Sequence, residues 1–154
     1  FCPKSNSISF IKIIKAKNST FSYDFFVISR IVSLILGKSV NDALKRAIAY
    51  SKAGTDCIMI HSKEKSPKQI FEFSKKFLKT KFARPLVAVP STYSKTYEKE
   101  LIINGFSIVI YANHLLRSSY FSMVNTAKKI LKNKRSYETE KSISSLNEIL
   151  ELIK

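Results

Sequence analysis

The sequence predicts an α/β fold built on a parallel sheet, and three observations support this class. Two apolar runs, Phe25–Ile28 and Cys57–Ile60, flank a helical pattern over Val40–Ala53, which is the order of a βαβ unit. The helix carries its own start and stop signals, because an S-x-x-D capping pair begins at Ser39 and Gly54 follows the last turn. Polar or turn residues close successive apolar runs at spacings of 31, 29 and 23 residues, at Arg30, His61, Pro90 and Asn113.

This spacing is typical of a repeating β/α unit, and two architectures fit four such units. A closed (β/α)8 barrel usually needs about 250 residues, so four units in 154 residues would be half of one. A half-barrel leaves two open sheet edges, which natural proteins rarely tolerate. A small, complete, doubly wound sheet is the alternative, and the pattern alone leaves both open.

The remaining elements are predicted from the same kinds of signal. A loop over Phe1–Ser9 precedes a short helix, and a capping box formed by Ser66 and Gln69 opens a later one. The polar segment Arg135–Lys141 can act as an extended arm. The elements expected are the helices Phe10–Lys17, Ser66–Lys79, Tyr97–Asn104, Leu116–Lys132 and Ser144–Ile153 and the strands Pro85–Val89 and Ser107–Tyr111.

Composition and charge exclude several classes of protein. Hydrophobic residues make up 45% of the chain, which argues against disorder, and no apolar run approaches the roughly 20 residues that span a bilayer. The net charge of +16 resembles a nucleic-acid signal, but only five of the 27 basic residues are Arg and the lysines are spread over nearly every helix. We therefore expect neither a nucleic-acid nor a membrane partner. The two cysteines, Cys2 and Cys57, indicate a reducing compartment, and a cytoplasmic location is expected.

Two polar side chains stand where the first two strands are expected to end. Ligands of parallel α/β folds bind at the carboxyl ends of the strands. Arg30 closes the first apolar run and His61 closes the second, so these residues are the first site candidates. Ser62, which follows, is expected to cap the turn after the strand.

Six stretches of sequence together carry a family resemblance. They are PKSNS at Pro3–Ser7, SRIVSLILGKSVNDALKRAIAY at Ser29–Tyr50, AGTDCIMIHSKEKSP at Ala53–Pro67, PLVAVPSTY at Pro85–Tyr93, GFSIVIYANHLLRSSY at Gly105–Tyr120 and the closing SLNEILELI. The chain resembles the C-terminal half of a phosphoenolpyruvate mutase, of the isocitrate lyase superfamily, over nearly its whole length. The resemblance implies the C-terminal half of a (β/α)8 TIM-type barrel, strands 5–8, over residues 1–134. A linker and a terminal helix would follow over residues 135–154.

The resemblance also implies an activity. Such enzymes depend on Mg²⁺ and interconvert phosphoenolpyruvate and phosphonopyruvate, which makes the carbon–phosphorus bond of phosphonates. The aspartates that hold Mg²⁺ in the family would lie upstream of Phe1, so no metal ligand is expected in this chain. We therefore expect a fragment that is inactive alone.

The resemblance assigns roles to five residues. Lys4, Asn6 and Ser7 would lie on the loop that gates the active site and would supply donors to the migrating phosphoryl group. Arg30 would clamp the phosphoryl oxygens, since its guanidinium offers paired planar donors. His61 would hydrogen-bond the substrate or orient Arg30. Asn113 and His114 would form the wall of the barrel mouth.

Two departures from the family favour a non-catalytic remnant over an active enzyme. Val32 stands where the family has an acidic residue, and the segment between Ser7 and Asp24 is shorter than expected. A phosphonopyruvate hydrolase, which delivers the phosphoryl group to water, is the rival within the family. A non-catalytic remnant of the family is the rival from another functional class. Barrels of this family pair by exchanging their last helix, so a homo-oligomer is expected, with Ser144–Ile153 crossing between subunits.

Overall fold

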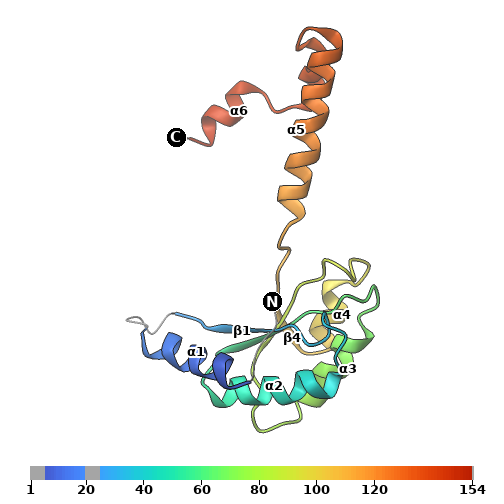
Figure 1. Cartoon of the computed structure of the whole chain (residues 1–154). Coiled ribbons are helices and arrows are strands. Elements are labelled where there is room, and N and C mark those ends of the chain that lie inside the picture. The colour runs from blue at the N-terminus through green and yellow to red at the C-terminus, as the bar shows by residue number, and fades with distance from the viewer. Residues whose placement is uncertain (1–5, 20–24, 154) are drawn as a thin grey trace. The chain divides into compact units, whose positions relative to one another are not determined.

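The computed structural model describes residues 6–19 and 25–153, apart from the side chains of residues 6–8. The chain divides into two compact units, and the boundary between them along the sequence lies between Ala112 and Asn113 (Figure 1). Within the described residues, the first unit contains a sheet with helices and the second contains helical elements. No helix in the described part of the chain is long and apolar enough to cross a membrane.

The first unit alternates helices and strands. Its elements are α1 (Asn6–Asn18), β1 (Ile28–Ile31), α2 (Val40–Lys52), β2 (Cys57–Ile60), α3 (Lys68–Phe77), β3 (Leu86–Ala88), α4 (Glu98–Ile103) and β4 (Phe106–Val109). All pairings are parallel, and each strand lies beside the next in the chain, in the order β1-β2-β3-β4. A doubly wound sheet reverses its strand order at a switch point, whereas a β/α barrel adds strands in sequence. The strand order is therefore that of half a barrel.

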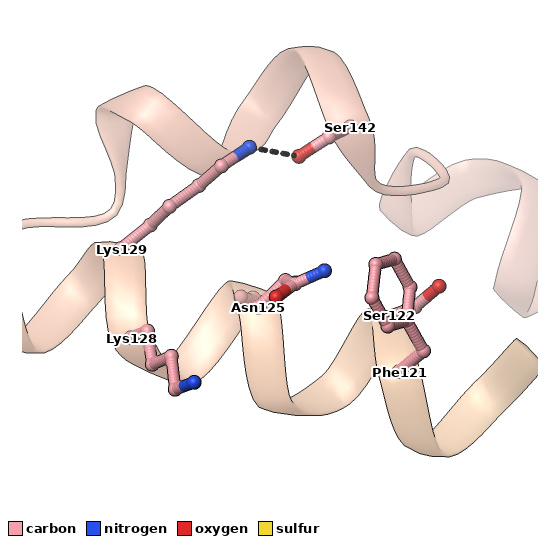
Figure 2. Close-up of a pocket in the computed structure, with 7 residues that line it drawn as sticks. Phe121, Ser122, Asn125, Lys128, Lys129 and Ser142 are labelled. Atoms are coloured by element: carbon pink, nitrogen blue, oxygen red, sulfur yellow. Dashed lines mark hydrogen bonds between the residues drawn. The ribbon is translucent and has the colours of Figure 1, made fainter.

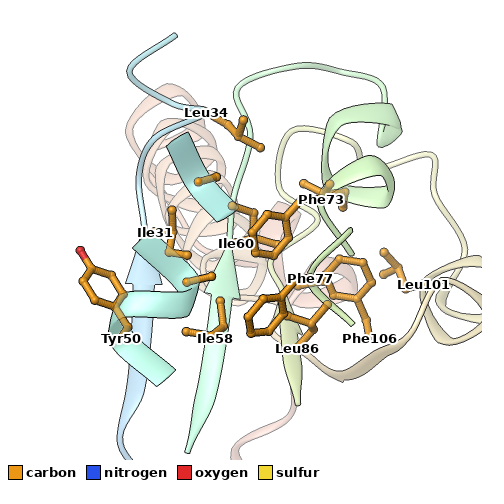
Figure 3. Packing of buried hydrophobic residues seen from close by; sticks show 14 of the residues in the cluster. Ile31, Leu34, Tyr50, Ile58, Ile60, Phe73, Phe77, Leu86, Leu101 and Phe106 are labelled. Atoms are coloured by element: carbon orange, nitrogen blue, oxygen red, sulfur yellow. The ribbon is translucent and has the colours of Figure 1, made fainter. Parts of the chain in front are cut away.

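One face of this sheet forms the hydrophobic core. Strand side chains alternate between faces, and register-paired residues share a face, so Ile31, Ile60 and Ala88 lie on the same side. All three are buried in one cluster with residues from every helix of this unit, among them Ile13 of α1, Ala47 of α2, Phe73 of α3 and Leu101 of α4. Figure 3 shows the side chains of α3 packed over β2 and β3. Helices α1 to α4 thus cover this face of the sheet.

Strand β1 begins later than expected. The apolar run Phe25–Ile28 was expected to be a buried strand, but Phe25 and Phe26 are exposed and the strand covers Ile28–Ile31. The reason lies in Val27, whose backbone N–H donates to the Asp56 carboxylate at 2.8 Å. Its carbonyl accepts from Asp56 N at 3.0 Å and from the Thr55 hydroxyl at 2.8 Å. The carbonyl also keeps the sheet bond from Cys57 N at 3.4 Å, so only the N–H of Val27 is diverted from the sheet, and regular pairing starts at Ile28.

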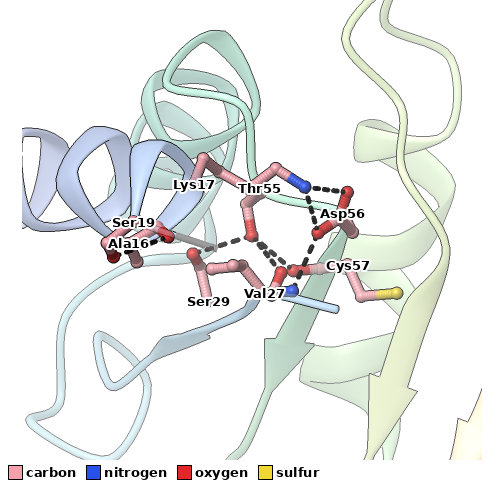
Figure 4. Close-up of polar contacts among 8 residues, drawn as sticks. All are labelled: Ala16, Lys17, Ser19, Val27, Ser29, Thr55, Asp56 and Cys57. Atoms are coloured by element: carbon pink, nitrogen blue, oxygen red, sulfur yellow. Dashed lines mark hydrogen bonds and ion pairs between the residues drawn. The ribbon is translucent and has the colours of Figure 1, made fainter. Parts of the chain in front are cut away.

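The same contacts join α1 to the amino ends of the strands (Figure 4). Lys17 of α1 forms an ion pair with Asp56 at 3.0 Å, and the buried Ser29 donates to Thr55 at 2.8 Å. Burial raises the pKa of the Asp56 carboxyl, but the hydrogen bond from Val27 and the charge of Lys17 outweigh it, so the pKa lies below its usual value. Contacts at the amino ends of barrel strands serve stability, since ligands bind at the carboxyl ends.

Two expected helix starts are corrected by the structure. Helix α1 begins at Asn6, so the loop expected over Phe1–Ser9 is wrong from Asn6 onward. Helix α3 begins at Lys68 and the capping box expected at Ser66 is absent, because Gln69 accepts a hydrogen bond from Ser62 instead. The helix expected over Val40–Ala53 is confirmed as Val40–Lys52, with the Ser39 hydroxyl accepting from the backbone of Asp42.

Gly105 separates α4 from β4 and cannot be replaced without strain. Its φ of +84° lies in the left-handed region, and an added Cβ would overlap Leu78. We expect Gly105→Ala to lower the free energy of unfolding by about 2 kcal/mol, measured by urea denaturation. Gly37→Ala is the matched control, because Gly37 has a similar φ of +72° but its nearest atom lies at 3.7 Å. Equal losses in the two variants would contradict the contribution of the Leu78 contact.

The second unit contains α5 (His114–Asn133), the 3₁₀ helix η1 (Tyr137–Ser142) and α6 (Leu146–Glu151). Helix α5 ends at Asn133, and the next residue, Lys134, has a φ of +57° that turns the chain. The extended arm expected over Arg135–Lys141 is wrong. Arg135 pairs with Glu138 at 2.6 Å, and Thr139 donates to the carbonyl of Ser136, which favours a helical turn.

Element η1 lies against α5 within this unit. The Lys129 ammonium donates to the Ser142 hydroxyl at 3.1 Å (Figure 2). A pocket of about 420 Å³ lies beside this bond, between the two helices. Its lining is mostly exposed side chains, and we assign it no ligand.

Candidate functional site

Arg30 and His61 lie on the face of the sheet that the helices leave uncovered. Arg30 pairs in register with Met59, and its neighbours Ser29 and Ile31 are the residues buried under the helices. His61 follows β2 directly, two residues after Met59, so the alternation of the strand places it on the same face. The sequence predicted both residues at carboxyl strand ends. The structure brings them together on one face there.

The environment of His61 keeps its ring neutral. Burial lowers the pKa of the imidazole below its usual value, and the positive charge of Arg30 lowers it further. A hydrogen bond to the backbone of Val89 opposes these effects without cancelling them. At neutral pH the pair therefore carries one positive charge, on Arg30.

Arg30 itself is exposed, and within the described residues no carboxylate pairs with it. An arginine whose five donors are not engaged by a carboxylate can bind an anionic ligand in a bidentate manner. The face of the sheet thus presents a guanidinium beside a neutral imidazole, an arrangement suited to a phosphate or phosphonate group.

The loops after β2 and β3 are tied together at the same edge. Ser62 is fully buried; its hydroxyl accepts from Glu64 N at 3.1 Å and donates to Gln69 at 2.7 Å. The expectation that Ser62 caps the turn after the strand is confirmed. Its carbonyl accepts from the Thr92 hydroxyl at 2.7 Å. These bonds hold the residues that follow β2 against the loop that follows β3.

The loop after β1 is anchored by hydrogen bonds to helix α2. The Ser33 hydroxyl donates to Asp42 at 2.6 Å, and Arg46 pairs with the same carboxylate oxygen at 2.9 Å. Burial raises the pKa of Asp42, but the bonds from Ser33 and Arg46 and the charge of Arg46 lower it more. The carboxylate therefore stays ionised, and it anchors the segment that directly follows Arg30.

The other predicted site residues are placed as follows. Lys4 lies outside the described residues. Asn6 and Ser7 lie in the first turn of α1, so the backbone there is helical and not the expected loop, and their side chains are outside the description. Asn113 and His114 belong to the second unit, which is described by itself.

Metal-ligand chemistry has no support among the described residues. No three His, Cys, Asp or Glu side chains in that part of the chain are grouped closely enough to hold a metal ion. The described residues therefore do not fit the Mg²⁺ that the resemblance implies, and we assign no step to a metal.

Comparison with known proteins identifies the family. A family described as phosphoenolpyruvate phosphomutase matches residues 1–131. The chain belongs to this family. The phosphoenolpyruvate phosphomutase of Tetrahymena pyriformis is 33% identical to it over 144 residues, which cover 93% of this chain and 47% of the relative. The phosphonopyruvate hydrolase of Variovorax sp. is 34% identical over 142 residues, which cover 92% of this chain and 48% of that protein.

A solved structure confirms the fold. The crystal structure of the phosphoenolpyruvate phosphomutase from Streptomyces platensis subsp. rosaceus matches with a TM-score of 0.91 at 35% identity, covering 96% of this chain and 50% of that one. The predicted C-terminal half of a (β/α)8 barrel is therefore confirmed, and the doubly wound alternative is wrong. The chain spans about half the length of the curated phosphomutase-family relatives it matches.

Sequence reasoning missed part of the site. Val89, Thr92 and Tyr93 all contact His61 or its neighbour Ser62, and none was proposed as a site residue. The signal available was the polar sequence Ser91–Tyr93 directly after a buried strand, where parallel folds place ligand-binding loops.

Proposed function

We propose that this chain supplies the phosphoryl-binding part of a phosphoenolpyruvate mutase, an enzyme that interconverts phosphoenolpyruvate and phosphonopyruvate. The observation that carries the proposal is the placement of Arg30 and His61 on the same, uncovered face of the sheet, at the carboxyl ends of the neighbouring strands β1 and β2. Membership of the phosphomutase family supports it.

The reaction requires these residues to bind the phosphoryl group while it moves. Phosphorus leaves carbon 3 of phosphonopyruvate for the oxygen on carbon 2, so a C–P bond breaks, an O–P bond forms and no atom is gained or lost. The phosphoryl group carries its negative charge on oxygens that do not react. Arg30 would hold two of these oxygens by paired N–H bonds while the group moves. His61 lies beside Arg30 and would contact the same group through its accessible ring nitrogen.

The test compares the 154-residue chain with the product of its whole coding region. Phosphonopyruvate is supplied with Mg²⁺, and products are followed by ³¹P NMR. We expect no turnover by the 154-residue chain, since its described residues hold no cluster of metal ligands. We expect the complete product to form phosphoenolpyruvate and to lose activity on addition of EDTA.

Each other outcome of this assay has a definite meaning. Turnover by the 154-residue chain alone would contradict its expected inactivity. Release of inorganic phosphate and pyruvate by the complete product would replace the mutase with the hydrolase. Absence of either product from a folded complete protein would favour the non-catalytic remnant.

We also propose that the chain self-associates through its last helix. The apolar side chains Leu146, Ile149, Leu150 and Ile153 are exposed within the described structure. Helix α6 has six residues, too few to hold a helix in water without packing. We expect a dimer in sedimentation experiments and a shift toward monomer or aggregate when residues 142–154 are deleted.

A pair of matched substitutions sharpens this test. Ile149→Gln should weaken association, whereas Glu151→Gln on the same helix should leave it unchanged. A stable monomer at all concentrations for the unmodified chain would contradict the proposed exchange.

A further inference from the structure

Ser62, the residue directly after His61, is fixed by hydrogen bonds from two different loops. Its side chain is fully buried, and its hydroxyl both donates to Gln69 of α3 and accepts from the backbone of Glu64. Those two bonds lie within the segment that follows β2. The bond to its carbonyl comes from much farther along the chain, from the hydroxyl of Thr92 at 2.7 Å, thirty residues later.

The bond from Thr92 continues the connection between two strands beyond the end of the sheet. The register of β2 and β3 ends with the pair Ile60 and Ala88. Ser62 lies two residues after Ile60, where no ladder bond joins the two segments any longer. The hydroxyl of Thr92 therefore takes over from the ladder at the carboxyl ends of the strands, where parallel folds bind their ligands.

The same loop makes a second contact, with His61 itself. The ring centroids of Tyr93 and His61 are 6.3 Å apart, with the planes inclined at 48°. Tyr93 is fully buried and belongs to the hydrophobic core cluster, whereas His61 is half-buried. Two successive residues of the loop after β3 thus meet two successive residues after β2. The hydrogen bond from Thr92 keeps the loop in place, and the ring of Tyr93 covers part of the imidazole.

A second threonine shows what the same bond does where no ligand site is expected. Thr80 is half-buried like Thr92, and its hydroxyl donates to the carbonyl of Phe77 at 2.8 Å. That bond spans three residues and closes the turn after α3, on the amino side of β3. The two bonds have the same chemistry, but only the bond of Thr92 joins two loops beside a candidate site residue.

We propose that Thr92 is a positioning residue, which holds the carbonyl of Ser62 and thereby fixes the main chain of His61 beside the ligand. In this role its hydroxyl is engaged by Ser62, so it acts on the ligand only through His61. Only the identity of that ligand, a phosphonate or phosphate ester, rests on the proposed function.

The first experiment uses Thr92→Val in the 154-residue chain, because valine keeps the shape of threonine and lacks its hydroxyl. The ring protons of His61 are titrated by NMR; the sequence has two histidines, so a His114→Gln variant assigns the signals. Loss of the bond should loosen the loop over the imidazole and admit water. Because burial is the main cause that lowers the pKa of His61, we expect that pKa to rise toward its usual value.

Two further variants serve as controls for this titration. Thr80→Val removes the same kind of bond at the other ends of the strands and should leave the titration of His61 unchanged. Thr92→Ser keeps the hydroxyl and should also leave it unchanged. The proposal is overturned if a folded Thr92→Val variant titrates like the unmodified chain, or if Thr92→Ser shifts the pKa as far as Thr92→Val does.

A second measurement applies if Thr92→Val does not fold. Backbone order parameters from ¹⁵N relaxation in the unmodified chain should be about 0.85 for the amides of Ser62 and Lys63, the value of rigid backbone, although both residues lie beyond β2. Values below about 0.6 would mean that this peptide is not held, and would also overturn the proposal.

A kinetic measurement separates this proposal from the proposed function. In the product of the whole coding region, Thr92→Val should lower kcat/KM for phosphonopyruvate by about tenfold, the scale of a small misplacement of a ligand-binding group. Thr80→Val should leave it close to that of the unmodified protein. If the unmodified protein does not act on phosphonopyruvate but the His61 titration shifts as expected, the proposed function fails and the positioning role stands. If turnover is normal in Thr92→Val, the positioning role fails and the proposed function stands.

Discussion

Arg30→Lys is expected to lower kcat/KM for phosphonopyruvate by at least about thirtyfold in the product of the whole coding region. That factor corresponds to about 2 kcal/mol of transition-state stabilisation, the scale found for removal of one donor at an anion site. Lysine keeps the positive charge but loses the two parallel N–H donors that match adjacent phosphoryl oxygens. Steady-state kinetics with phosphonopyruvate measure the effect.

Arg84→Lys is the matched control for this substitution. Arg84 is also exposed, but it lies just before β3, at the amino ends of the strands, whereas Arg30 lies at their carboxyl ends. The control should stay close to the unmodified enzyme. If Arg30→Lys does so too, Arg30 does not clamp the phosphoryl group.

The largest loss of stability is expected from Phe77→Ala. Phe77 is fully buried in the single core cluster of the first unit and stacks on Phe73, with ring centroids 5.6 Å apart and planes inclined at 14°. Removing a buried phenyl ring leaves a cavity and costs about 3–5 kcal/mol. Natural domains are stable by only about 5–15 kcal/mol, so the variant should unfold at a much lower urea concentration.

Phe26→Ala provides the comparison within the same unit. The side chain of Phe26 is 64% exposed, so its truncation should change the free energy of unfolding by less than about 1 kcal/mol. Similar losses in the two variants would contradict the single-face core described above.

Local signals in the sequence were sufficient for much of the fold. The strand Cys57–Ile60 has the predicted bounds, because its apolar run is closed on both sides by polar residues. The helix that begins at Val40 was predicted from its cap, and the hydrogen bond from Asp42 to Ser39 confirms that cap. Such features depend on residues no more than about four positions apart, so a local sequence pattern is enough to predict them.

Features that depend on distant partners could not be predicted in this way. Phe25 and Phe26 were expected to be buried, but both are exposed, and the Asp56 carboxylate, 29 residues after Val27, takes the N–H of Val27 away from the sheet. The contact between Tyr93 and His61 is likewise invisible in the sequence, since it joins the ends of two strands. Arg30 and His61 were identified because parallel topology places all carboxyl strand ends at one edge.

The alternation of side chains along β1 has a consequence for how this family can vary. Arg30 faces the ligand side only because Ser29 and Ile31 face the helices. A single residue inserted before Ile28 without compensation in the loop would move the arginine into the core and an isoleucine onto the ligand face. Insertions and deletions should therefore be confined to the connecting segments, whereas the strands should tolerate replacement of residues but not a change in their number.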